Sequence, residues 1–65
     1  MRVLLNGDEQ QVEAANLAEA LEALNYRDVI VATALNGEFV PHDRRAETPI
    51  QDGDAIEVLA PMQGG

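Results

Sequence analysis

Two glycines at the end of the chain, Gly64 and Gly65, are the residues best suited to chemistry. A C-terminal carboxylate is ionised at neutral pH and is a poor electrophile, so another enzyme must activate it, for example as an acyl-adenylate. Glycine has no Cβ, which lets the backbone enter a narrow slot, and five extended residues reach about 17 Å. Residues 61–65 are therefore predicted to form an extended, flexible tail that is an enzyme's substrate, although a Gly-Gly end alone also fits a frayed terminus.

Other side chains offer less. His42 is the only histidine and cysteine is absent, so no metal site is expected. The QDGD segment at 51–54 lacks the further oxygen ligands of a calcium loop and is predicted to be a turn. Arg44 and Arg45 are expected to form a solvated patch that could help a partner choose its docking face. Without serine or a glycine-rich phosphate loop, neither enzymatic activity nor a cofactor is expected.

Composition narrows the possible partners and location. The 65 residues allow one small domain. Twelve acidic residues against four arginines give a net charge of −8, which argues against nucleic acid and anionic membranes and favours a basic protein surface. No apolar run approaches the roughly 20 residues that cross a bilayer, so a cytoplasmic protein is expected.

The first half of the chain predicts a hairpin and a helix. Asn-Gly at positions 6 and 7 lies between two short runs and predicts a tight turn within a hairpin over residues 1–13. Asn16 is a suitable helix cap, and Glu19 stands three residues later, where its side chain reaches back to the cap. An amphipathic helix of about three turns is expected over NLAEALEALN, with apolar residues at helical spacing.

The second half predicts three more strands. A strand over 29–35, a second Asn-Gly turn and a short returning strand precede PHDRRAETP (41–49), whose prolines predict a surface loop or a 3₁₀ turn. The last strand, AIEVLA (55–60), follows QDGD. The predicted core residues, including the choice of inward-facing side chains on the 29–35 strand, are Val3, Leu5, Leu17, Leu21, Leu24, Val31, Leu35, Ile56 and Val58.

The order of elements, β-β-α-β-β-β, predicts a two-layer α+β domain over 1–60 with one helix packed across one face of a mixed sheet, followed by the tail at 61–65. If the last strand runs parallel to the first, it occupies the centre of the sheet. This arrangement resembles the β-grasp fold of ubiquitin-like proteins. Alternation then turns Leu4 and Leu59 outward on neighbouring strands, and we expect them to form a docking patch near the tail, rimmed by Glu57.

Four segments together resemble the ThiS/MoaD family of sulfur carriers, and within it the ThiS group of thiamine biosynthesis: LNG near the start, ALNGEFVP (34–41), TPIQDGDAIEVL (48–59) and the final Gly-Gly. The resemblance implies that an E1-like adenylyltransferase uses ATP to adenylate Gly65. Sulfur delivered through a cysteine desulfurase then gives a thiocarboxylate, which thiazole synthase consumes. It also implies that Gly64 is recognised by these enzymes, and it assigns no role to Met62 or Gln63.

Two alternatives remain at this point. A MoaD-type carrier would donate its sulfur to a molybdopterin precursor or another product, and a ubiquitin-like binding module would use no sulfur chemistry. Adding one residue after Gly65 would disable a carrier but not a binding module.

Overall fold

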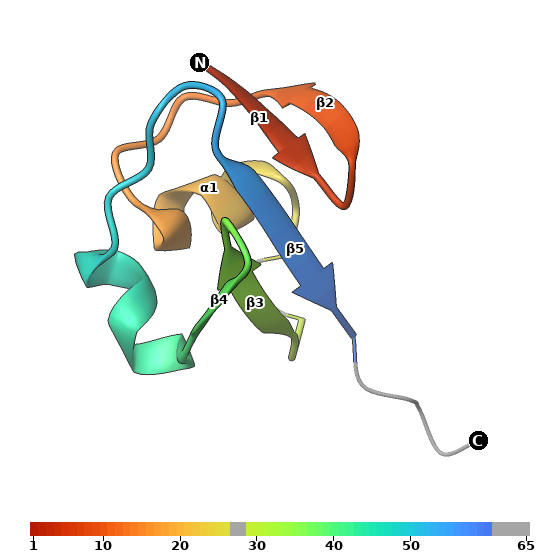
Figure 1. The fold of residues 1–65 in the computed structure, drawn as a ribbon. Helices are drawn as coiled ribbons and strands as arrows, with labels where there is room; N and C mark the ends of the chain where they lie inside the picture. The colour runs from red at the N-terminus through yellow and green to blue at the C-terminus, as the bar shows by residue number, and fades with distance from the viewer. Residues whose placement is uncertain (27–28, 61–65) are drawn as a thin grey trace.

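The computed structural model describes residues 1–26 and 29–60 (Figure 1). The tail with Gly64 and Gly65 lies outside the described residues. The elements are β1 (Arg2–Leu5), β2 (Asp8–Gln11), α1 (Leu17–Ala23), β3 (Ala32–Leu35), β4 (Glu38–Val40), the 3₁₀ helix η1 (His42–Glu47) and β5 (Ala55–Leu59). The sheet order is β2-β1-β5-β3-β4, with β5 parallel to β1 and antiparallel to β3. The predicted mixed sheet with the last strand at its centre is confirmed.

Both Asn-Gly pairs make the predicted turns. Asn6 and Gly7 have φ values of 51° and 88°, and Asn36 and Gly37 have φ values of 52° and 85°. These left-handed conformations are the ones that a two-residue hairpin loop requires. The loops join β1 to β2 and β3 to β4, so each turn fixes the register in which the two strands of its hairpin pair.

Helix α1 begins as predicted but is shorter. The Asn16 Oδ1 accepts a hydrogen bond of 2.9 Å from the Glu19 backbone N–H, while Glu19 Oε1 accepts one from the backbone N–H of Ala15, one residue before the cap. The helix spans seven residues, about two turns instead of the expected three. It stops because Asn25 adopts a φ of 72°, and the Tyr26 N–H bonds back to the Leu21 carbonyl at 2.8 Å, which is the geometry of a Schellman motif.

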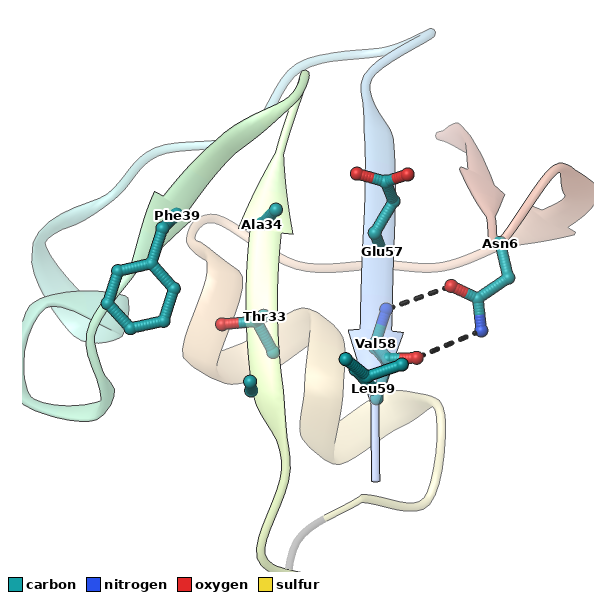
Figure 2. A pocket seen from close by; sticks show the side chains of 8 residues that line it. Asn6, Thr33, Ala34, Phe39, Glu57, Val58 and Leu59 are labelled. Atoms are coloured by element: carbon teal, nitrogen blue, oxygen red, sulfur yellow. Dashed lines mark hydrogen bonds between the residues drawn. The ribbon is translucent and has the colours of Figure 1, made fainter. Parts of the chain in front are cut away.

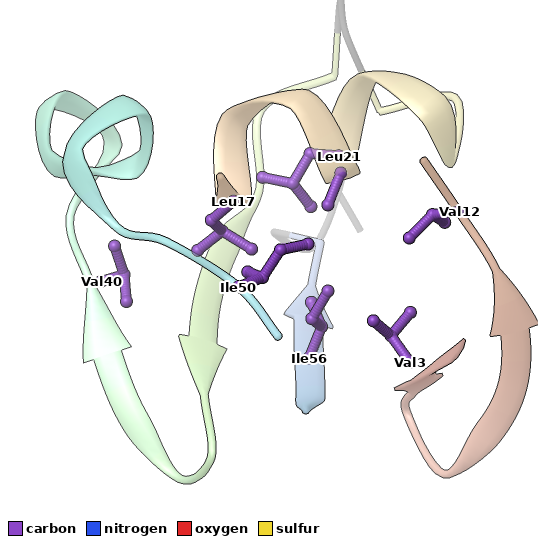
Figure 3. Close-up of a cluster of buried hydrophobic side chains, with 8 residues drawn as sticks. Val3, Val12, Leu17, Leu21, Val40, Ile50 and Ile56 are labelled. Carbon is purple, nitrogen blue, oxygen red and sulfur yellow. The ribbon is translucent and has the colours of Figure 1, made fainter. Parts of the chain in front are cut away.

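The core lies between α1 and the inner face of the sheet (Figure 3). Of the predicted core residues, Val3, Leu17, Leu21, Val31 and Ile56 are buried. The other four are half-buried and pack against the core cluster, which confirms the predicted inner face: Leu5, Leu24, Leu35 and Val58. Ala20, in the predicted apolar stripe of the helix, is also buried, and the structure adds three core members that the sequence analysis did not name: Val12, Val40 and Ile50. Ile50 lies outside the strands, where alternation gives no indication of which side chains point inward. Val12 lies within the predicted hairpin, one residue beyond β2, and its backbone N–H donates to the Met1 carbonyl at 2.9 Å.

The proline-bracketed segment forms η1, a 3₁₀ helix as anticipated, but its arginines differ from expectation. Arg44 is exposed, whereas Arg45 is buried, so the expectation of a solvated pair is wrong for Arg45. The Arg45 guanidinium donates to the Val31 carbonyl at 2.6 Å and to Thr33 Oγ1 at 3.1 Å, and its Nη1 lies 3.2 Å from His42 Nδ1. These partners accept hydrogen bonds from the buried guanidinium, and the bonds to Val31 and Thr33 connect η1 to the sheet. His42 itself is exposed, as expected.

Candidate functional site

Strand β5 leads directly to the tail. On one side its last residues pair with β3, with Val58 opposite Thr33 and Leu59 opposite Ala32. Ala60 is the last described residue. Residues 61–65 therefore follow in sequence from the central strand of the sheet, and the described surface nearest to them in the chain is the one around the end of β5.

The sheet face opposite α1 carries an apolar patch at this end. Alternation turns Glu57 and Leu59 outward on β5, and the strand register places Glu57, Ala34 and Phe39 in one row across β5, β3 and β4. Leu59 is 74% exposed and Phe39 is 66% exposed. Because β3 presents alanines on this face, a shallow hollow lies between the two large side chains (Figure 2). We call these five residues the outer patch: Ala32, Ala34, Phe39, Glu57 and Leu59.

The structure brings together only part of the predicted docking surface. Glu57 and Leu59 belong to the outer patch. Leu4 is also exposed, at 38%, but it stands opposite Ala55 in the β1–β5 register. Leu59 is four residue steps further along β5 than Ala55, or about 13 Å along the strand. Leu4 and Leu59 therefore share a face and neighbouring strands without forming one contiguous patch.

Phe39 was missed in the sequence analysis, although the sequence contained the signal. A two-residue loop at Asn36 and Gly37 pairs Leu35 with Glu38 and Ala34 with Phe39. Since Leu35 was predicted to face inward, Ala34 and Phe39, which form the next pair along the hairpin, must face outward. The hairpin register alone would have placed the largest side chain of the outer patch.

The charge of the outer patch comes from Glu57. Among the described residues no ion pair involves Glu57. Of the described arginines, Arg2 lies 4.0 Å from Glu9, Arg44 lies 3.2 Å from Glu47, and Arg45 is buried beneath η1. An apolar surface with an unpaired carboxylate is suited to binding a protein with an apolar centre and a basic group beside it.

Metal-ligand clusters and membrane-spanning helices are absent from the described part of the chain. No cluster of three or more histidine, aspartate or glutamate side chains there could hold a metal ion. Within the same residues, no helix is long and apolar enough to cross a membrane.

Comparison with known proteins decides the family. The sequence model of the ThiS family matches residues 3–65. The chain belongs to the ThiS family. The sulfur carrier protein ThiS of Thermus thermophilus is 40% identical over 63 residues, covering 97% of this chain and 98% of that protein. ThiS of Escherichia coli is 35% identical over 66 residues that cover the whole of both chains. The resemblance found in the sequence is confirmed, and the ThiS assignment places this chain among the sulfur carriers of thiamine biosynthesis.

Structural comparison agrees on the β-grasp fold. The crystal structure of ThiS from Geobacter metallireducens superimposes with a TM-score of 0.81 at 36% identity over the full length of both chains. A thiazole synthase of Paramagnetospirillum magneticum is 35% identical over 66 residues, which cover all of this chain and 20% of that protein. A ThiS-like segment thus occurs within a protein named as the enzyme that the family resemblance had implied as a partner.

Proposed function

We propose that this ThiS-family chain carries sulfur as a thiocarboxylate on Gly65 and does not itself catalyse a reaction. The observation that carries the proposal is the end-to-end match with the E. coli sulfur carrier, which includes Gly64 and Gly65. In the first step the Gly65 carboxylate attacks the α-phosphate of ATP, giving an acyl-adenylate and releasing pyrophosphate. In the second step a sulfide nucleophile attacks the acyl carbon, AMP leaves, and the terminal carboxylate has become a thiocarboxylate.

The composition supports the carboxyl group as the place where sulfur is held. The chain contains no cysteine, so no side-chain thiol could carry sulfur as a persulfide or thioester. It also contains no lysine, so no side-chain amine can accept an isopeptide bond from another copy. Both features suit a carrier that is loaded and unloaded at its end.

Three partners follow from this role. An E1-like adenylyltransferase would supply ATP and activation, a cysteine desulfurase would supply the sulfur, and thiazole synthase would consume it. The similarity to a segment of a thiazole synthase supports the last of these. The need for ATP and for a reduced sulfur donor points to action in the cytoplasm.

The outer patch could be the surface on which the E1-like enzyme binds this domain. Leu59 and Phe39 offer apolar contact area beside the end of β5, and Glu57 offers a charge that a basic side chain of the partner can meet. Docking there would hold the end of β5 against the enzyme while residues 61–65 reach about 17 Å further. Leu4, the third predicted docking residue, would lie at the margin of such a contact.

Intact-mass spectrometry tests the proposal. The protein is incubated with an E1-like enzyme known to load E. coli ThiS, together with ATP and sulfide, and E. coli ThiS serves as the positive control. We expect an ATP-dependent increase equal to the mass difference between sulfur and oxygen. No increase, while the control is loaded, would refute the proposal. Transfer of the sulfur to thiazole synthase, and not to a molybdopterin synthase subunit, would distinguish the ThiS role from a MoaD-type role.

A further inference from the structure

The parallel pairing between β1 and β5 ends before β5 does. Leu5 stands opposite Ile56, and the Asn6 backbone N–H donates to the Ile56 carbonyl at 2.9 Å. At Asn6 the chain then turns into the left-handed conformation of the hairpin loop, with φ of 51°, and leaves β5. The backbone of β1 therefore provides no partner for Val58, the next residue of β5 that faces it.

The side chain of Asn6 takes over at this point. Its Oδ1 accepts a hydrogen bond of 2.9 Å from the Val58 backbone N–H, and its Nδ2 donates one of 3.2 Å to the Val58 carbonyl (Figure 2). A carboxamide carries the same donor and acceptor as a peptide group. Asn6 thus extends the parallel ladder by one position, using its side chain where the backbone has turned away.

The other Asn-Gly turn also places an asparagine side chain in a hydrogen bond to β5, at the opposite end of the strand. Asn36 has φ of 52°, and its Oδ1 accepts a hydrogen bond of 2.9 Å from the backbone N–H of Ala55, the first residue of β5. The two asparagines are alike in turn type, backbone conformation and partner strand. They differ in that Asn36 Nδ2 donates to Asp54 Oδ1 at 3.1 Å, not to a carbonyl of β5. They also hold opposite ends of β5, and Asn6 holds the end that leads to the tail.

We infer that Asn6 is a positioning residue for loading of the tail, an inference that rests on the proposed function. Val58 is two residues before Ala60, and beyond it β3 pairs β5 on one side only, through Ala32 and Leu59. The Asn6 carboxamide is the contact on the other side, and it holds the last residues of β5 against the β1–β2 hairpin. Without this contact the point from which the tail starts can shift, and attack on a phosphate tolerates little misplacement of the carboxylate.

The bond can be lost without losing the fold. Asn6 is exposed, so water can replace its side chain as a partner of the Val58 peptide groups. Replacement by glycine also keeps the turn, because glycine adopts positive φ without strain. Asn6→Gly therefore removes the carboxamide and leaves the hairpin, and Asn36→Gly is a matched control that makes the same change at the far end of β5.

Loading kinetics with the E1-like enzyme and ATP test the inference at a temperature where both variants are folded. We expect Asn6→Gly to lower kcat by about tenfold or more with KM within about twofold of wild type. Asn6 only borders the hollow of the outer patch, and the apolar side chains there are kept while the carboxylate is misplaced. Asn36→Gly should stay within about twofold of wild type in both constants. Asn6→Asp, which keeps the acceptor but sets a carboxylate oxygen against the Val58 carbonyl, should also lower kcat.

Amide hydrogen exchange by NMR provides a readout that does not depend on a partner. Exchange of the Val58 amide should accelerate in Asn6→Gly and stay unchanged in Asn36→Gly. Equal kcat for the two glycine variants, or unchanged Val58 exchange in Asn6→Gly, would overturn the inference while wild type is still loaded. Failure of wild type to be loaded would instead refute the proposed function, and this inference with it.

Discussion

Arg45 donates a hydrogen bond from its Nε to Thr33 Oγ1 at 3.1 Å, and both residues are buried. Thr33 in turn donates to the Val40 carbonyl at 3.1 Å. The chain of bonds connects η1 to β3 and from there to the edge strand β4. Arg45, a charged residue of η1, is thus hydrogen-bonded through Thr33 to β4, the strand that carries Phe39.

The first prediction concerns this arginine. Arg45→Ala removes the partner of the Val31 carbonyl and leaves a space under η1, so we expect it to lower the free energy of unfolding by about 2–3 kcal/mol. Arg44→Ala is the control, because the exposed Arg44–Glu47 pair contributes less than about 1 kcal/mol. Urea denaturation of both variants measures the difference. Similar losses for the two arginines would contradict the structural role of Arg45.

The second prediction concerns the contact of α1 with the sheet. Leu21 is 4% exposed and belongs to the core cluster. Leu21→Ala should cost about 2–5 kcal/mol, which is most of the roughly 3–5 kcal/mol that a core of this size supplies. Thermal unfolding, monitored by circular dichroism, should show a much lower unfolding temperature for Leu21→Ala. Leu59→Ala, at an exposed position, should change the unfolding temperature little. An unfolding temperature for Leu21→Ala near that of wild type would mean that the core is elsewhere.

Much of the fold could be predicted because its signals are local. Asn-Gly requires a particular backbone conformation, Asn16 caps a helix through its own side chain, and alternation assigns the two faces of β5. Each of these depends on a few neighbouring residues, so the turns, the helix start and the inner face were all identified. The central position of β5 was expected on the condition that it runs parallel to β1, and the structure meets that condition.

The rest depends on contacts between distant segments. Burial of Arg45 is decided by Val31 and Thr33, residues 14 and 12 positions away, and nothing near Arg45 in the sequence indicates it. The early end of α1 depends on Asn25 adopting a left-handed conformation. The spacing of apolar residues along the helix gives no indication of that conformation. The separation of Leu4 from Leu59 is a matter of strand register, which the outward direction of both side chains does not determine.

The third prediction addresses docking. Leu59→Asp and Phe39→Asp place a charge in the outer patch and should each weaken binding to the E1-like enzyme by about tenfold or more, since both would be desolvated in a contact there. Leu4→Asp adds the same charge to the same face about 13 Å away, so it controls for general repulsion and should weaken binding less. Isothermal titration calorimetry measures the three affinities. Equal effects at all three positions would remove the reason for placing the contact at the outer patch.

The last prediction concerns the two glycines of the tail. Gly64→Ala adds a Cβ where we propose that the enzyme closes on bare backbone, so loading should fall sharply while the unfolding temperature stays that of wild type. Deleting Gly65 withdraws the carboxylate by about 3.5 Å, which is beyond the tolerance of attack on a phosphate. Intact-mass spectrometry after incubation with enzyme, ATP and sulfide should therefore show no sulfur on the shortened protein and little on Gly64→Ala. Because both changes lie outside the core, circular dichroism should find each variant folded. A sulfur adduct on the protein without Gly65 would show that the carboxyl group of that residue is not where sulfur is carried.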